Sequence, residues 1–103
     1  MTPKDKAATR DQVAERLAGH AQELRSLGMR SLELFGSVAR GDARPESDVD
    51  LLVKFDEVPG FVGYLRLRNR LQEILGRPVD LVMASGLRPR IRERVLREAL
   101  HVA

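Results

Sequence analysis

The chain of 103 residues is 43% hydrophobic and 32% charged, values typical of a soluble globular protein, so we expect one domain spanning residues 1–103. It has no cysteine, which excludes disulfides and thiolate metal sites and favours a reducing, cytoplasmic location. Its first residues contain no apolar stretch of signal-peptide length, and no apolar run approaches the roughly 20 residues of a membrane span, so we expect neither a signal peptide nor a membrane span. The net charge of +3 is weak evidence for nucleic-acid binding, because acidic residues are interspersed and the aromatic residues are one tyrosine and three phenylalanines, so we expect no direct contact with nucleic acid.

The first predicted helix begins at a capping box. Thr9 and Gln12 have the spacing of this motif, in which the side chain of each residue accepts a hydrogen bond from the backbone amide of the other. Apolar residues then recur at helical spacing, with His20 on the same stripe as a packing residue, and Gly28 is expected to end the helix. Residues 29–35 alternate between two faces and predict a strand.

Two further strands carry isolated acidic residues. Residues 49–55 alternate, with Val49, Leu51 and Val53 on one face. Asp48 and Asp50 then share the opposite face of that strand. A third short strand is predicted over residues 78–83, where Asp80 is the single acid in an otherwise apolar run.

Two more helices are predicted on either side of the third strand. Residues 61–75 have apolar side chains at helical spacing, and residues 87–99 form a strongly basic helix. The apolar stripe of the basic helix is Ile91, Val95 and Ala99, and its arginines are Arg88, Arg90, Arg92, Arg94 and Arg97. Such arginines are usually solvated, but they could also dock an acidic partner or steer a nucleotide. The element order is helix, strand, short turn, strand, helix, strand, helix.

The acidic residues form a candidate metal site. Residues two apart along a strand advance about 6.6 Å and project to the same side, so Asp48 and Asp50 can approach one small cation. Two carboxylates at that range repel unless a divalent ion lies between them, and hard oxygen donors suit Mg²⁺ or Mn²⁺. Asp80 can complete the set. The alternative is that Asp48 and Asp50 form a solvated face and that Asp80 pairs with an arginine such as Arg77.

A glycine-serine pair provides a candidate phosphate site. When a strand ends at Gly36 and a short helical turn follows, backbone N–H groups and the Ser37 hydroxyl are exposed to phosphate oxygens. Ser37 could also be the N-cap of that turn, and the two roles can coexist. Arg40 is a further candidate for a phosphate contact, the alternative being an ordinary surface arginine.

Gly36-Ser37, ten intervening residues, Asp48-Val-Asp50 and a later Asp80 together resemble the nucleotidyltransferase superfamily of the DNA polymerase beta type. The segment "GSVARGDARPESDVDLLV" is similar to the signature of minimal nucleotidyltransferases. The resemblance implies an α/β (α+β) fold with a small mixed sheet of about three strands flanked by helices. It also implies an enzyme that transfers a nucleoside monophosphate from a nucleoside triphosphate and releases pyrophosphate.

The resemblance assigns roles to individual residues. Asp48 and Asp50 match the metal-binding pair, and Asp80 matches the third carboxylate, so that two Mg²⁺ ions, or Mn²⁺ in their place, are implied. Gly36 and Ser37 match the turn that holds the triphosphate. Arg40 lies in the same motif and is a less specific match for a phosphate ligand.

Small stand-alone members of this family resemble the antitoxin of a two-gene module whose partner is a HEPN-type ribonuclease toxin. This implies transfer of AMP from ATP to a tyrosine of the toxin, and a possible complex of the two proteins. Two alternatives stay open. The chain could neutralise a toxin by contact alone, through its basic last helix, or it could modify a small hydroxylated molecule such as an aminoglycoside.

Overall fold

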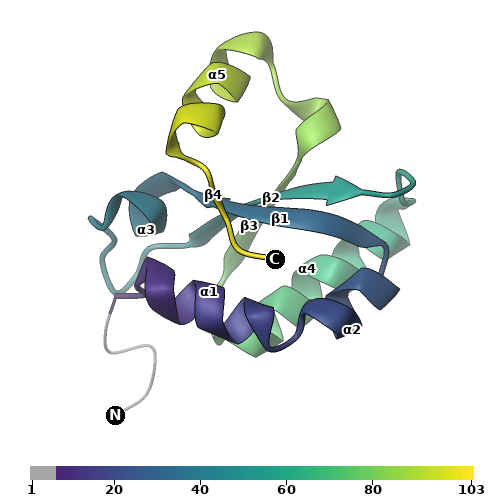
Figure 1. Ribbon diagram of the computed structural model, residues 1–103, viewed down its shortest axis with the longest axis horizontal. Coiled ribbons are helices and arrows are strands. Elements are labelled where there is room, and N and C mark those ends of the chain that lie inside the picture. Colours follow the sequence, from purple (N-terminus) through teal and green to yellow (C-terminus); the bar gives the residue numbers. More distant parts are fainter. Residues whose placement is uncertain (1–6) are drawn as a thin grey trace.

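A mixed sheet of four strands forms the centre of the described part of this computed structural model, residues 7–103 (Figure 1). The strand order is β3-β2-β1-β4, in which β2 runs antiparallel to β1 and parallel to β3, and β4 runs antiparallel to β1. In chain order the elements are α1 (Arg10–Ala18), α2 (Ala21–Ser26), β1 (Met29–Phe35), α3 (Gly36–Arg40), β2 (Val49–Phe55), α4 (Phe61–Leu75), β3 (Val79–Met83), the 3-10 helix η2 (Ala84–Gly86), α5 (Pro89–Glu98) and β4 (Leu100–His101). The expected fold class, a small mixed sheet flanked by helices, is confirmed.

Three helices cover one face of the sheet. Figure 1 shows α1, α2 and α4 on one side and α5 on the other. The core lies between the sheet and the three helices, since alternate residues of β1 and β2 point toward them and are fully buried. These core side chains are Leu17, Leu24, Leu32, Leu34, Leu51, Val53, Leu67 and Leu71. No helix within residues 7–103 has the length and apolar character that a bilayer span requires.

The predicted first helix is wrong in its extent, because the chain forms two helices there. The capping box of Thr9 and Gln12 is confirmed at the start of α1. Gly19 ends α1, and its amide donates to the carbonyl of Glu15. His20, with a φ of −116°, lies outside helical geometry and is the N-cap residue of α2. Glycine is a poor helix former, which explains a break that the apolar spacing alone does not reveal.

The fourth strand was not predicted from the sequence. β4 pairs with β1 through two residues only, Leu100 opposite Leu34 and His101 opposite Glu33. A strand of two residues has no alternating pattern, so it cannot be distinguished from the end of the preceding helix. The sheet therefore has one strand more than the three expected.

The predicted apolar stripe of α5 is only partly confirmed. Val95 is 3% exposed, but Ile91 is 49% exposed. Leu96, which was not assigned to the stripe, is 56% exposed. Figure 1 shows why: α5 stands away from the sheet, so one turn of the helix packs on the rest of the chain while the remainder faces solvent.

Candidate active site

Strand register brings Asp50 and Asp80 together. The two residues are paired across the parallel strands β2 and β3, so both side chains project from the same face at the usual interstrand spacing of about 4.8 Å. This face is opposite the three core helices. The Asp80 side chain is close enough to Asp50 to raise the pKa of that carboxyl group.

Asp48 lies outside the strand that was predicted to carry it. β2 begins at Val49, and Asp48 is an exposed residue of the preceding loop. It is close enough for its charge to act on Asp50. Within residues 7–103 no three acidic, histidine or cysteine side chains are arranged to hold a metal ion. The structure therefore brings two of the three predicted carboxylates into contact and places the third beside them.

The electrostatics of the site act mainly on Asp50. Burial and the negative charges of Asp80 and Asp48 raise the pKa of Asp50 from 3.8 to about 6. The positive charge of Arg40 opposes this rise. A cation placed at these carboxylates would relieve the same repulsion, so the donor set fits a hard divalent ion.

Gly36 lies directly against the Asp50 carboxylate. Its φ is +74°, and a Cβ atom on this residue would lie 2.1 Å from Oδ2 of Asp50, closer than any two such atoms can approach. Only glycine satisfies both conditions. The spacing of the motif therefore corresponds to a physical contact, in which the turn after β1 closes over the carboxylate on β2.

α3 positions the remaining residues of the turn. Ser37 is the second residue of α3 and is half-buried. Its carbonyl oxygen accepts hydrogen bonds from the backbone amides of Gly41 and Asp42. The interpretation of Ser37 as a helix N-cap is wrong, because Phe35 occupies that position and no side chain caps it. The Ser37 hydroxyl is thus not used as a cap at the start of α3.

Arg40 is held by two carboxylates at the end of α3. Its Nη1 donates to both oxygens of Glu98 at 3.2 Å, and its Nε donates to Oδ2 of Asp42 at 3.2 Å. The hydrogen bond to Asp42 contributes most to raising the pKa of Arg40, and Glu98 acts in the same direction. Glu98 belongs to α5, 58 residues further along the chain, and no sequence pattern links the two.

Arg77 and Tyr64 each make a side-chain hydrogen bond to a distant carbonyl group. Arg77 is 9% exposed, and its Nη1 donates to the carbonyl of Pro45 at 3.0 Å, which fixes the loop leading to Asp48. The hydroxyl of Tyr64 on α4 donates to the carbonyl of Leu81 on β3 at 2.6 Å. The role of Arg77 in positioning the loop was missed, since a single arginine after a helix gives no signal of it.

Two carboxylates on neighbouring strands of a mixed sheet, closed over by a Gly-Ser turn, define a candidate site for phosphate transfer chemistry. The family profile described as "Nucleotidyltransferase domain" matches residues 17–102. The chain therefore belongs to the nucleotidyltransferase domain family, and it is an enzyme of that class. This confirms the resemblance found in the motif.

The most informative relatives are small proteins of the same family. The protein adenylyltransferase MntA of Thermococcus cleftensis is 42% identical over 95 residues, which cover 91% of this chain and 96% of the relative. A solved structure provisionally assigned as a minimal nucleotidyltransferase superimposes with a TM-score of 0.78 at 41% identity, covering 90% of this chain and 95% of the other.

A more distant solved structure shows the fold alone. It contains a tri-AMPylated HEPN toxin of Shewanella oneidensis in complex with its MNT antitoxin. The matching chain has a TM-score of 0.65 at 18% identity, with coverage of 88% of this chain and 71% of that chain.

Proposed function

We propose that this nucleotidyltransferase transfers AMP from ATP to a tyrosine hydroxyl of a HEPN-type toxin and thereby acts as a cytoplasmic antitoxin. The observation that carries the proposal is the contact of Gly36 with Asp50, beside Asp80, because it places a phosphate-binding type of turn against paired carboxylates. The relative that is 42% identical is named a protein adenylyltransferase, which supports a protein as acceptor. The HEPN complex of the distant neighbour, which shares the fold, suggests the class of partner.

In the proposed reaction the residues of the site have separate tasks. The backbone amides that follow Gly36 and the hydroxyl of Ser37 hold the triphosphate. The tyrosine oxygen attacks the α-phosphorus and forms a new P–O bond, while the bond from the α-phosphorus to the bridging oxygen breaks and pyrophosphate leaves. Asp80 accepts the proton of the tyrosine hydroxyl. Catalysis by these groups rests on positioning the two reactants in line.

Mg²⁺ is the cation that the donor set would take. Asp50 and Asp80 would hold it, with Asp48 turning in from the loop as the third carboxylate, and the family resemblance implies two such ions. When bound, the ions neutralise charge on the phosphate oxygens. The mutual repulsion that raises the pKa of Asp50 supports this assignment.

Transfer of label from α-labelled ATP tests the proposal. With Mg²⁺ and a lysate of the host cell, we expect the native chain to label one small protein on tyrosine, and we expect a chelator or the substitution Asp50→Asn to abolish the labelling. Asp56→Asn is the matched control, because Asp56 is an exposed residue just beyond the far end of β2. Neutralisation of the toxin that persists without transfer would indicate inhibition by contact alone. Label found only on a small molecule would indicate an acceptor such as an aminoglycoside.

Arg40→Gln is expected to raise the half-saturating ATP concentration about tenfold, as loss of a charged phosphate contact does. It should also raise the pKa of Asp50 further, because Arg40 opposes that rise, so the acid limb of the rate–pH profile shifts to higher pH. The measurement is the ATP dependence of the initial rate at several pH values. Glu98→Gln is the control, since it removes a partner of Arg40 and keeps its charge. Equal effects of the two substitutions would show that Arg40 acts only by holding α5.

A further inference from the structure

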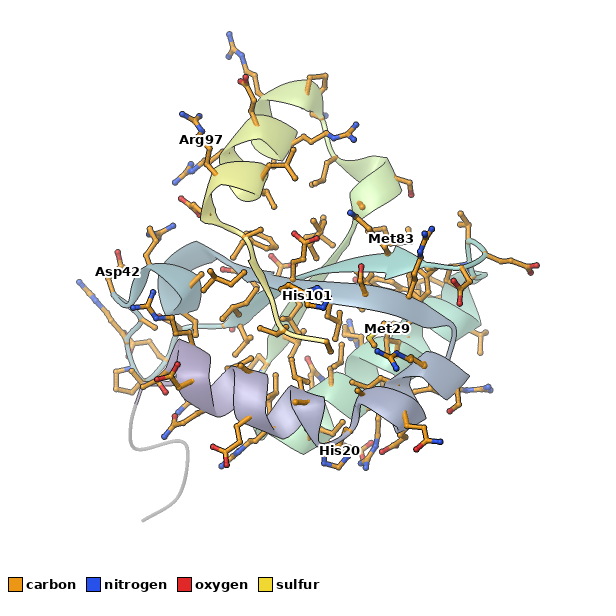
Figure 2. The ribbon with its side chains drawn as sticks, viewed as in Figure 1. His20, Met29, Asp42, Met83, Arg97 and His101 are labelled. Carbon is orange, nitrogen blue, oxygen red and sulfur yellow. The ribbon has the colours of Figure 1, made fainter. Side chains whose placement is uncertain are left out.

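The helix α5 carries more positive charge than its own surroundings neutralise. Five arginines and two glutamates lie within residues 88–98, and all five arginines are exposed. Glu98 forms ion pairs with Arg40 and Arg94. In the described part of the chain, no carboxylate pairs with the other four arginines, Arg88, Arg90, Arg92 and Arg97. Figure 2 shows Arg97 on the outer side of α5, away from the sheet.

Apolar side chains lie among these arginines. Leu96 is 56% exposed and lines an open groove of about 450 Å³, whose other lining residues are Pro89, two arginines, Arg90 and Arg92, and one acid, Glu93. Ile91 is 49% exposed near the start of the same helix. A leucine in solvent between unpaired arginines is the pattern of an interface, with an apolar centre and a charged rim.

α5 is also joined to the candidate active site. It stands on the face of the sheet that carries Asp50 and Asp80, opposite the three core helices (Figure 1). Glu98 at its end binds Arg40 at the end of α3, the turn that closes over Asp50. A protein bound along α5 would therefore lie beside the paired carboxylates.

We propose that the outer face of α5, with Leu96 at its centre and Arg92 and Arg97 at its rim, is the docking surface for the protein that accepts AMP, and that this protein presents an apolar side chain surrounded by carboxylates. The inference rests on the proposed function, which requires a protein acceptor at this site. The charge of the surface indicates the kind of partner, because the exposed arginines attract an acidic surface. The exposed side chain of Leu96 would contribute nothing to a surface that binds only phosphates, so it indicates a protein partner. Docking here delivers the acceptor hydroxyl to the face where Asp80 lies.

The test compares two pairs of charge reversals. Arg92→Glu with Arg97→Glu alters the rim of the proposed surface, whereas Arg25→Glu with Arg66→Glu changes the charge equally on α2 and α4, which cover the opposite face. The probe is the purified HEPN-type protein of the host, and its binding to the full chain is measured without ATP at low and high salt. Initial rates of AMP transfer are then measured against the concentration of the same protein.

The α5 pair is expected to weaken binding and raise the half-saturating acceptor concentration at least about tenfold, with the rate at saturation and the half-saturating ATP concentration unchanged. Its residual binding should depend less on salt than native binding does. Leu96→Ser should weaken binding several-fold and leave the salt dependence unchanged. The control pair should behave as the native chain.

Native-like binding by the α5 pair, or an equal loss in the control pair, would overturn the docking surface while leaving the proposed function intact if AMP is still transferred. Binding that needs Arg92 and Arg97, without any transfer, would support the surface and refute the proposed reaction. If the native chain binds a single-stranded RNA oligonucleotide through these arginines and fails to bind the protein, the surface serves nucleic acid and the inference is wrong.

Discussion

Asp50→Asn is expected to abolish AMP transfer, by about a thousandfold or more, and to raise the melting temperature at neutral pH. The loss of activity follows because the neutral amide cannot replace a carboxylate that holds a divalent cation. The gain in stability follows because the charge of Asp50 is unfavourable in the folded state, where burial and the charges of Asp80 and Asp48 raise its pKa to about 6. The asparagine amide can donate a hydrogen bond to Asp80.

The direction of the pH dependence follows from this raised pKa. The folded chain binds a proton at Asp50 more readily than the unfolded chain, whose pKa is near 3.8. The stabilising contribution of Asp50 is therefore complete below about pH 4 and is lost as the pH rises through about 6. At neutral pH the substitution should recover about 1 kcal/mol after allowance for solvent screening, or roughly 5 °C in melting temperature for a chain of this size.

Thermal unfolding with a chelator present, across this pH range, measures the effect without metal. The native and Asp50→Asn proteins should have similar melting temperatures near pH 4 and should diverge as the pH rises. Asp56→Asn should follow the native curve, because Asp56 is exposed and is not among the charges that act on Asp50. A melting temperature for Asp50→Asn that stays at or below the native value at neutral pH would contradict the electrostatic account of the site.

Local patterns in the sequence were sufficient to find the candidate site residues but not to place them relative to one another. Alternation along residues 49–55 put Asp50 on the face opposite the core, and the structure agrees. The pairing of Asp50 with Asp80 depends on the parallel register of β2 and β3. The two strands are joined by a crossover that contains α4, so their register depends on contacts distant in sequence that no local period records.

Contacts that hold the site were hidden for the same reason. Arg77 fixes the loop before Asp48 through the carbonyl of Pro45, 32 residues away. Glu98 binds Arg40 from a helix whose pattern identified only a basic face. Both are single long-range hydrogen-bonding partners, and their identity depends on tertiary packing rather than on spacing.

Gly36→Ala is expected to damage both the fold and the activity, because two separate conditions require glycine at this position. The residue has a φ of +74°, and an added Cβ would lie 2.1 Å from Oδ2 and 2.9 Å from Cγ of Asp50. We expect a destabilisation of about 2–3 kcal/mol, from backbone strain together with displacement of the carboxylate. Transfer should fall at least about a hundredfold, since the turn and Asp50 can no longer occupy adjacent positions.

Gly76→Ala separates the two conditions. Gly76 has a φ of +65° at the end of α4, but a Cβ there would meet no atom within 4 Å. It should therefore lose only the roughly 1 kcal/mol that backbone strain costs and should keep its activity. Chemical denaturation gives the two free energies of unfolding. If Gly36→Ala lowers the free energy of unfolding no more than Gly76→Ala does, the contact with Asp50 does not restrict the residue at position 36.

A double-mutant cycle assigns the remaining cost to its partner. With Asp50→Ala the carboxylate is gone, so adding Gly36→Ala should then cost only about the 1 kcal/mol of backbone strain. The coupling free energy between the two positions should be of the order of 1–2 kcal/mol, so that the double variant is more stable than the sum of the two single changes in unfolding free energy predicts. The glycine of the motif and the first aspartate of β2 would then be one structural unit, in which the turn that seats the triphosphate and the carboxylate that holds the cation fix each other's position.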